Sequence, residues 1–292
     1  MNKITQQELL DAGVHFGHLK RKWNPKMLPF IFMERKGIHI IDLNKTIEGL
    51  EDAGNAMKAM AKAGRKILFV ATKKQAKDIV AQCAQRTSMP YVTERWLGGM
   101  LTNFSTIRKS VKKMQSIEKM LADGTLENIT KKEKLMMSRD KDKMEKIIGG
   151  IANMSRLPSA IFIVDIGHEH IALAEAKKLN IATFAMVDTN CDPNTVDYAI
   201  PANDDATKSI TAITTYLMNC VLEGLEERKN EKVDESDEAA EEAAANLAAA
   251  EGNDDADSAD RRRKGGRGAA PGAGDKNMRK PAHKVGGDRK PR

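Results

Sequence analysis

Three short, mostly apolar runs constrain the fold of this 292-residue chain more strongly than any other feature. They occupy residues 66–71, 159–165 and 182–188, and a shorter fourth run occupies residues 196–200. Runs of this kind are typical of strands that are buried on both faces, as in parallel sheets. Helical patterns alternate with the runs, which predicts βαβ units and an α/β fold, a three-layer α/β/α sandwich with a parallel sheet.

The residues ahead of the first run predict a helix, a hairpin and a second helix. Thr5 and Glu8 have the spacing of a capping box for a helix over residues 5–12. Apolar residues on both sides of a charged tip predict a β-hairpin over residues 30–41. Apolar residues then recur at helical spacing over residues 44–63. We therefore expect a small antiparallel element before the parallel sheet begins.

The stretch from Arg95 to Asn103, with the sequence RWLGGMLTN, separates two differently patterned parts of the chain. Its adjacent glycines, Gly98 and Gly99, permit backbone angles that other residues avoid, and they let another backbone or a ligand approach closely. Two interpretations are open. The stretch is either a tight turn with Trp96 in the core, or a binding loop that presents a planar cation and an aromatic face.

Residues 104–155 predict two helices joined by a short break. Thr102 or Asn103 can cap the first helix, and the apolar pattern stops at residues 122–125. It resumes after a capping box that begins at Thr130, which predicts an antiparallel helical hairpin or short coiled coil. The segment holds 12 basic and seven acidic side chains. It is either a coiled coil with a solvated face or a basic arm over RNA, and the excess of cations favours the arm.

A basic loop with an aromatic residue in it occupies residues 19–26. Its lysines and arginine surround Trp23, and such interleaving suits phosphate contacts together with stacking on a base or sugar. The same composition suits a solvated loop whose Trp23 is anchored in the core. The residues of the loop do not separate these two interpretations.

Charge is distributed unevenly along the chain, although the formal net charge is only +7. Residues 231–260 hold 12 acidic residues and one lysine, and residues 261–292 hold 12 basic and two acidic residues. Residues 1–230 keep 35 basic and 27 acidic residues, and this excess favours a polyanionic partner. Because aliphatic and aromatic content collapses after residue 230, residues 230–292 are expected to form a disordered tail that contacts nucleic acid or folds back on itself.

The sequence argues against catalysis and against a membrane span. No GxGxxG motif follows the first predicted strand, no GxxxxGKS or GxxxxGKT motif occurs, and no serine or cysteine has a recognisable nucleophile context. Three scattered cysteines without metal-ligand spacing fit a reducing cytoplasm. No apolar run reaches membrane-spanning length. We therefore expect no enzyme, no cofactor, no small-molecule substrate and no membrane partner.

Acidic residues are expected where predicted strands end. Asp188 follows one strand, and Asp204 and Asp205 follow the last one. With His18 or His168, these carboxylates could hold a divalent ion, and oxygen ligands would favour Mg²⁺. Helix capping and turn formation explain the same residues without a metal, and we prefer that interpretation and assign no metal ligand.

Several motifs occur in order along the chain: AGVHFGH at residues 12–18, WNPKM at 23–27, RWLGGMLTN at 95–103, LP at 157–158, Asp165 with HEH at 168–170, VDTN at 187–190 and DP at 192–193. Together they resemble the bacterial small-subunit ribosomal protein S2 family, over roughly residues 5–228. The resemblance implies a flavodoxin-like α/β/α domain with an inserted helical hairpin. It also implies binding to 16S ribosomal RNA (rRNA) where the head of the small subunit meets its body, help in holding ribosomal protein S1, and no enzymatic activity. The tail departs from the short end that is usual in the family.

Under this resemblance the chain divides into four parts, which are residues 1–103 (the N-terminal segment and first part of the α/β domain), 104–155 (the inserted hairpin), 156–229 (the second part of the α/β domain) and 230–292 (the tail). The expected partners are 16S rRNA and neighbouring small-subunit proteins, S1 included, in the cytoplasm. Most of the expected rRNA contacts are cations. They are Lys20, Arg21, Lys22, Trp23, Asn24, Lys26, Arg35, Lys36, Lys73, Lys74, Arg95, Trp96, Asn103, Arg108, Lys109, Lys112, Lys113, Lys131 and Lys132.

Two alternatives come from other classes of protein. One is a nucleotide- or metal-dependent α/β enzyme that uses the crevice near Asp188 and Asp205. The other is a pure protein-interaction scaffold that uses the helical hairpin as its docking arm. Neither has a motif of its own in the sequence, and fold alone cannot supply a function.

Overall fold

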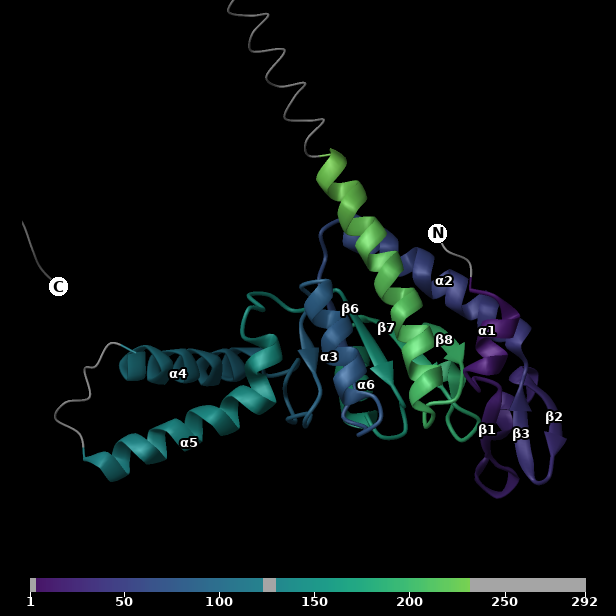
Figure 1. Ribbon diagram of the computed structural model, residues 1–292, viewed down its shortest axis with the longest axis horizontal. Coiled ribbons are helices and arrows are strands. Elements are labelled where there is room, and N and C mark those ends of the chain that lie inside the picture. The colour runs from purple at the N-terminus through teal and green to yellow at the C-terminus, as the bar shows by residue number, and fades with distance from the viewer. Residues whose placement is uncertain (1–3, 123–129, 232–292) are drawn as a thin grey trace, which may run out of the picture. The chain divides into compact units, whose positions relative to one another are not determined.

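A five-stranded parallel sheet forms the centre of the protein in the computed structural model, which describes residues 4–122 and 130–231 (Figure 1). The strands are β4 (Ile67–Val70), β5 (Tyr91–Val92), β6 (Ala160–Val164), β7 (Ala182–Val187) and β8 (Tyr198–Pro201). Their order is β5-β4-β6-β7-β8. Counted along the chain this is 2-1-3-4-5, one of the two common doubly wound orders. The predicted α/β fold with a parallel sheet is confirmed.

Helices cover both faces of this sheet, because successive strand side chains point to opposite faces. Phe69 and Phe162, whose ring centroids are 5.6 Å apart, pack with α2, α3 and the helix of residues 207–231. Leu68 and Ile161 point the other way and pack with α6. The bounds of the labelled helices are Leu43–Lys62 for α2, Lys77–Arg86 for α3 and His170–Lys178 for α6. The three layers follow from this alternation.

The connection between β7 and β8 departs from the predicted alternation of strand and helix. It carries only a short 3-10 helix, η4 (Pro193–Thr195). The carboxylate of Asp197 accepts hydrogen bonds from Thr183 N and Oγ1 at 2.8 and 2.9 Å, and Thr183 Oγ1 accepts one from Asp197 N at 3.0 Å. These bonds tie the start of β8 to the start of β7, so that the two strands are held in register without a crossover helix.

A small antiparallel sheet, in the order β1-β3-β2, precedes the parallel one. β2 (Ile31–Arg35) and β3 (Ile38–Ile41) form the predicted hairpin. Its turn residues, Lys36 and Gly37, have φ of 53° and 74°, as a two-residue type I′ turn requires. β1 (Phe16–Leu19) pairs with β3 and was not predicted, because its four residues lack a clear alternation.

The first helix, α1 (Gln6–Asp11), begins at the predicted capping box. Thr5 Oγ1 accepts a hydrogen bond from Glu8 N at 3.3 Å, and the Glu8 carboxylate accepts one from Thr5 N at 2.8 Å. Gly13 follows with φ of +73°, a left-handed conformation that ends the helix. This element is confirmed in both its start and its end.

The two helices α4 (Phe104–Ala122) and α5 (Lys131–Ile148) lie side by side in Figure 1. Lys141 of α5 forms an ion pair with Glu118 of α4 at 3.4 Å. The predicted capping box of Thr130 and Glu133 begins α5. The predicted break between the helices lies, from residue 123 on, outside the described residues.

All described residues belong to one of the two units into which the chain divides, Met1–Asp234. Within this described part, no helix is both long and apolar enough to cross a membrane. The prediction for the tail concerns residues that, from 232 on, lie outside the description.

Candidate nucleic-acid interface

The basic loop and the hairpin tip meet and form one cationic surface. Lys20 N donates a hydrogen bond to Gly37 O in the hairpin turn at 3.0 Å. We call the five exposed cations gathered here the cationic ridge; they are Lys20, Arg21, Lys22, Arg35 and Lys36. Lys20 is paired with Glu34 at 2.7 Å, whereas the other four form no ion pair with any described residue. The structure therefore brings together two predicted contact segments that are about 14 residues apart in sequence.

The rest of the basic loop is partly engaged within the protein. It folds into two 3-10 helices, Lys20–Lys22 and Pro25–Phe30, where the sequence predicted an irregular loop. The half-buried ring of Trp23 lies 5.0 Å from that of His39. Lys26 is paired with Asp192 at 2.6 Å. Both residues are therefore fixed by protein contacts.

Asn24 forms hydrogen bonds that hold this loop in place. Its Oδ1 accepts a hydrogen bond from Lys26 N at 3.0 Å, and its backbone N–H donates to Thr189 O at 2.8 Å. The loop is thus attached to the segment that follows β7. Asn24 therefore positions the basic loop through its backbone and its side chain.

A single buried carboxylate organises the turn between Arg95 and Asn103. Glu175 Oε1 accepts hydrogen bonds from Trp96 Nε1 at 3.1 Å and Gly99 N at 2.7 Å. Its Oε2 accepts from Leu101 N and Thr102 N at 3.0 Å each, and from Thr102 Oγ1 at 3.1 Å. Burial raises the pKa of Glu175, but the hydrogen bonds to Thr102, Trp96 and the backbone outweigh it and leave the pKa below its ordinary value. The carboxylate is therefore ionised, and both of its oxygens accept hydrogen bonds from the turn.

This arrangement corrects one predicted contact. Trp96 is only 8% exposed and its indole N–H is taken by Glu175, so its ring is unavailable for stacking on a base. Arg95 and Asn103 stand at the two ends of the turn and are exposed. The stretch is thus a tight turn with its tryptophan inside, and not a loop that presents that ring. Glu175 was missed because an acidic residue in an amphipathic helix normally faces solvent.

Six of the predicted contacts lie on α4 and α5. Arg108 donates from one guanidinium nitrogen to Met154 O at 3.3 Å and Ser155 O at 2.7 Å, so it holds the segment that leads back to the sheet. The other five are exposed lysines, which are Lys109, Lys112, Lys113, Lys131 and Lys132. Their ammonium groups form no ion pair with a described residue, whereas Arg108 is half-buried and engaged.

Lys73 is another predicted RNA contact whose side chain is engaged within the protein. Its ammonium lies 3.0 Å from Asp165, 2.9 Å from Asp204 and 2.7 Å from Asp205. Burial would lower the pKa of Lys73, but these carboxylates raise it well above its ordinary value. A cation surrounded by three carboxylates has no charge left for a phosphate. The next residue, Lys74, is exposed.

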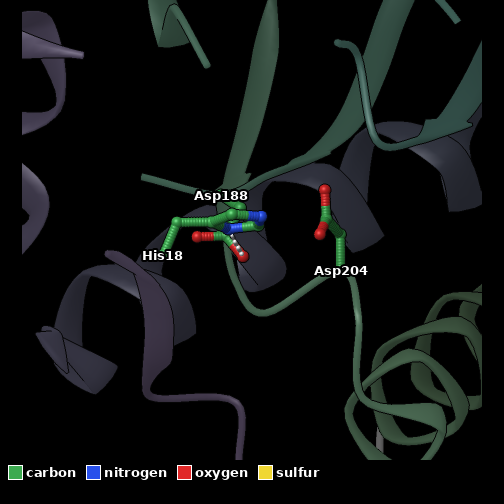
Figure 2. Close-up of side chains that lie close together, drawn as sticks. All are labelled: His18, Asp188 and Asp204. Carbon is green, nitrogen blue, oxygen red and sulfur yellow. Dashed lines mark ion pairs between the residues drawn. The ribbon is translucent and has the colours of Figure 1, made fainter. Parts of the chain in front are cut away.

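The same acidic cluster includes His18, which comes from the end of β1 (Figure 2). Its Nδ1 lies 2.9 Å from Asp188 Oδ2, and its Nε2 lies 3.5 Å from Asp205 Oδ2. The hydrogen bond that His18 donates to the carboxylate of Asp188 raises the pKa of His18, against the effect of burial. Burial raises the pKa of Asp204 to about 7, helped by the charges of Asp165 and Asp188. The cluster is a network of interacting charged groups at the carboxyl ends of the strands.

His18, Asp188 and Asp204 could hold a divalent cation. One ligand atom from each lies within 4.8 Å of the others, and Figure 2 shows the three side chains facing one space. His168 is exposed, lies within hydrogen-bond distance of Thr72 Oγ1, and does not belong to this set. Capping, the alternative to a metal site, is seen at Asn203, next to Asp204. Its Oδ1 accepts hydrogen bonds from the backbone N–H groups of residues 205 and 206.

The three cysteines have the properties of structural residues. Cys83, Cys191 and Cys220 are all free and buried. Burial raises the pKa of the Cys191 thiol to about 12, with the carboxylate of Asp165 adding to the effect. A thiol with so high a pKa carries almost no thiolate at neutral pH and is a poor nucleophile.

The fold and these sites define a class of protein, an α/β scaffold with exposed cationic loops.

Comparison with known proteins identifies the family. Residues 9–224 match the family described as Ribosomal protein S2. The "Small ribosomal subunit protein uS2" of Cytophaga hutchinsonii is 61% identical over 232 residues, which are 80% of this chain and 91% of the relative. The proteins of that name from Flavobacterium johnsoniae (63% over 231 residues, 79% and 91% covered) and Porphyromonas gingivalis (60% over 232 residues, 80% and 83% covered) are equally similar.

The chain therefore belongs to the ribosomal protein S2 family. This is a family of structural proteins of the small ribosomal subunit and not a family of enzymes. The resemblance that the sequence motifs indicated is confirmed. The residues that contact RNA are not part of what these comparisons establish, and they stay predictions.

Proposed function

We propose that this protein binds 16S rRNA at the junction of the head and body of the small subunit, as a structural constituent in the cytoplasm that supports translation without catalysis. The observation that carries the proposal is the cationic ridge. Arg21, Lys22, Arg35 and Lys36 are exposed and form no ion pair with a described residue, although carboxylates surround the cations at the nearby sheet edge. Unpaired guanidinium and ammonium groups on rigid turns suit the phosphates of folded RNA.

Helices α4 and α5 act, in this proposal, as an arm inserted between β5 and β6 that adds a second RNA contact. Five exposed lysines on these two helices support this role. The arm begins directly after the turn held by Glu175, so the direction of α4 is set by a buried network. The remaining parts of the chain keep the division predicted from the sequence, and the predicted tail lies, from residue 232 on, outside the described residues.

The experiment that tests this function is sedimentation of the protein in an extract of the cells that make it. The protein is expected to migrate with small ribosomal subunits and to be released when ribonuclease digests the RNA. A pure protein scaffold would keep its complex after digestion. Migration as a free protein in untreated extract would refute the proposed function.

Docking of ribosomal protein S1 is the second part of the proposal, and exposed apolar side chains support it. Phe16, Leu28, Phe32 and Met33 are 48, 64, 70 and 49% exposed on the small sheet and the 3-10 helix beside it. Exposed large apolar side chains can supply a protein-interaction site. Small subunits assembled with a Phe32→Ser variant should retain several-fold less S1 than wild-type subunits, measured by quantitative immunoblotting of pelleted subunits. Undiminished S1 would place its docking surface elsewhere.

A further inference from the structure

A cavity of about 830 Å³ opens at the amino ends of the parallel strands, away from every site described above. Arg65 and Lys66 precede β4, and Arg156 precedes β6. The acidic cluster around Lys73 lies after the carboxyl ends of the same strands, at the opposite edge of the sheet. Doubly wound folds usually bind ligands at the carboxyl edge, so no fold-based expectation pointed to this cavity.

The lining of the cavity is cationic and contains no carboxylate. Arg65, Lys66 and Arg156 line it and are exposed at its rim, and none of its lining residues is acidic. Arg228 lies beside the lining residue Gly64, since a Cβ built on Gly64 would come within 2.3 Å of its guanidinium carbon. At the carboxyl edge, by contrast, Lys73 contacts three carboxylates. Uncompensated positive charge is therefore a specific property of this cavity.

Local contacts hold these cations in place. Lys66 Nζ donates a hydrogen bond to Ser88 O at 2.9 Å, which orients the ammonium without neutralising it. The two hydrogen bonds from Arg108 to the backbone carbonyls of residues 154 and 155 fix the segment that carries Arg156. Neither Arg65 nor Arg156 forms an ion pair with a described residue. Two exposed arginines on fixed backbone are suited to bidentate recognition of a phosphate group.

We propose that this cavity binds a phosphodiester of the RNA backbone and is a second rRNA contact at the amino edge of the sheet. The inference rests on the proposed RNA binding and extends it to residues outside the motifs that carry the family resemblance. RNA is favoured over a free nucleotide because the cations stand at an open rim and are exposed. The cavity also adjoins the end of α5 through Gly149 and Gly150, so an RNA strand along the arm would reach it.

The test compares the full-length wild-type protein with an Arg65→Ala, Arg156→Ala double variant in binding to 16S rRNA over a range of salt concentrations. Each neutralised phosphate contributes about 0.7 to 0.9 to the slope of log affinity against log salt. The double variant removes both arginines from one phosphate, so it should lose about 0.8 from the slope and roughly 6-fold in affinity at 0.1 M salt. A Lys177→Ala, Lys208→Ala variant loses the same charge from exposed positions elsewhere and should stay close to wild type.

The outcomes separate this inference from the proposed function. If the wild type binds 16S rRNA and the double variant binds with the same affinity and slope, the cavity is not an RNA contact, although the proposed function stands. If the wild type fails to bind, the proposed function itself fails. The last measurement is a titration of the protein alone with pyrophosphate. Saturable binding of pyrophosphate that the double variant loses would assign the cavity to a small phosphate compound instead. Unchanged thermal unfolding of the double variant shows that it folds.

Discussion

Replacing Arg21, Lys22, Arg35 and Lys36 together by alanine is expected to lower the affinity for 16S rRNA by roughly 10³-fold at 0.1 M salt. The reason is counterion release, because each phosphate that loses its protein cation removes nearly a factor of ten from the affinity at this salt concentration. The slope of log affinity against log salt should fall by about 3. Stability should change little, since all four side chains are exposed and form no ion pair with a described residue. Lys20 is left in place because its partner is Glu34.

The matched control for this variant removes the same charge elsewhere. Lys177, Lys178, Lys208 and Lys229 are exposed and lie outside the proposed contact surfaces. Their fourfold alanine variant should lose far less affinity than the variant of the cationic ridge. Equal losses in both variants would mean that net charge attracts the RNA and that the ridge is no specific contact.

Glu175→Gln is expected to destabilise the protein by about 2 to 4 kcal/mol, because hydrogen bonds to a buried charged group are each worth more than neutral ones and buried donors left unpaired carry a penalty. A glutamine has only one acceptor oxygen, whereas Glu175 accepts five hydrogen bonds from the turn and the tryptophan. A loss of this size lowers the melting temperature by about 5 to 15 °C in a chain of this length. Thermal and urea unfolding measure it, and Glu226→Gln, at an exposed position, is the control that should change little.

The same variant has a signature in its dependence on pH. The pKa of Glu175 is lowered in the folded protein, so the stability it contributes is fully present above its ordinary value of 4.5 and is lost as the pH falls below that value. The gap between wild type and Glu175→Gln should therefore narrow in acid. A gap that stays constant from neutral pH to pH 3 would show that packing, and not the ionised carboxylate, accounts for the destabilisation.

Much of the fold was predictable because a strand that is buried on both faces is apolar at nearly every position. The runs that became β4, β6 and β7 are apolar at nearly every position, since helices cover both faces of the sheet. Capping boxes at Thr5 and Thr130 marked two helix starts, since the bonds involved span only three residues. β1 was missed because a four-residue edge strand with no clear alternation resembles a loop in sequence. The hydrogen bonds between Thr183 and Asp197, which join the starts of β7 and β8, are revealed by no local pattern.

The candidate site was less predictable than the fold, because charge alone does not tell an engaged cation from a free one. Lys73 and Arg21 look alike in the sequence, yet one meets three carboxylates from distant segments and the other meets none among the described residues. Trp96 was assigned to the surface as a contact, and its buried partner, Glu175, lies 79 residues away. The cavity at the amino edge joins residues from three segments that carry no shared motif. Such long-range pairings appear only when the chain is folded.

The most direct test of the account is the salt dependence of wild-type binding to purified 16S rRNA. A protein that binds folded RNA through its phosphates should bind tightly at low salt, and its log affinity should fall steeply with log salt concentration. The slope should be about −4 or steeper if the cavity and the four ridge cations without an ion pair to a described residue are all engaged. Tight binding at 50 mM salt that falls by at least a hundredfold at 300 mM is the predicted result. Binding that is absent at low salt, or that does not change with salt, would contradict it.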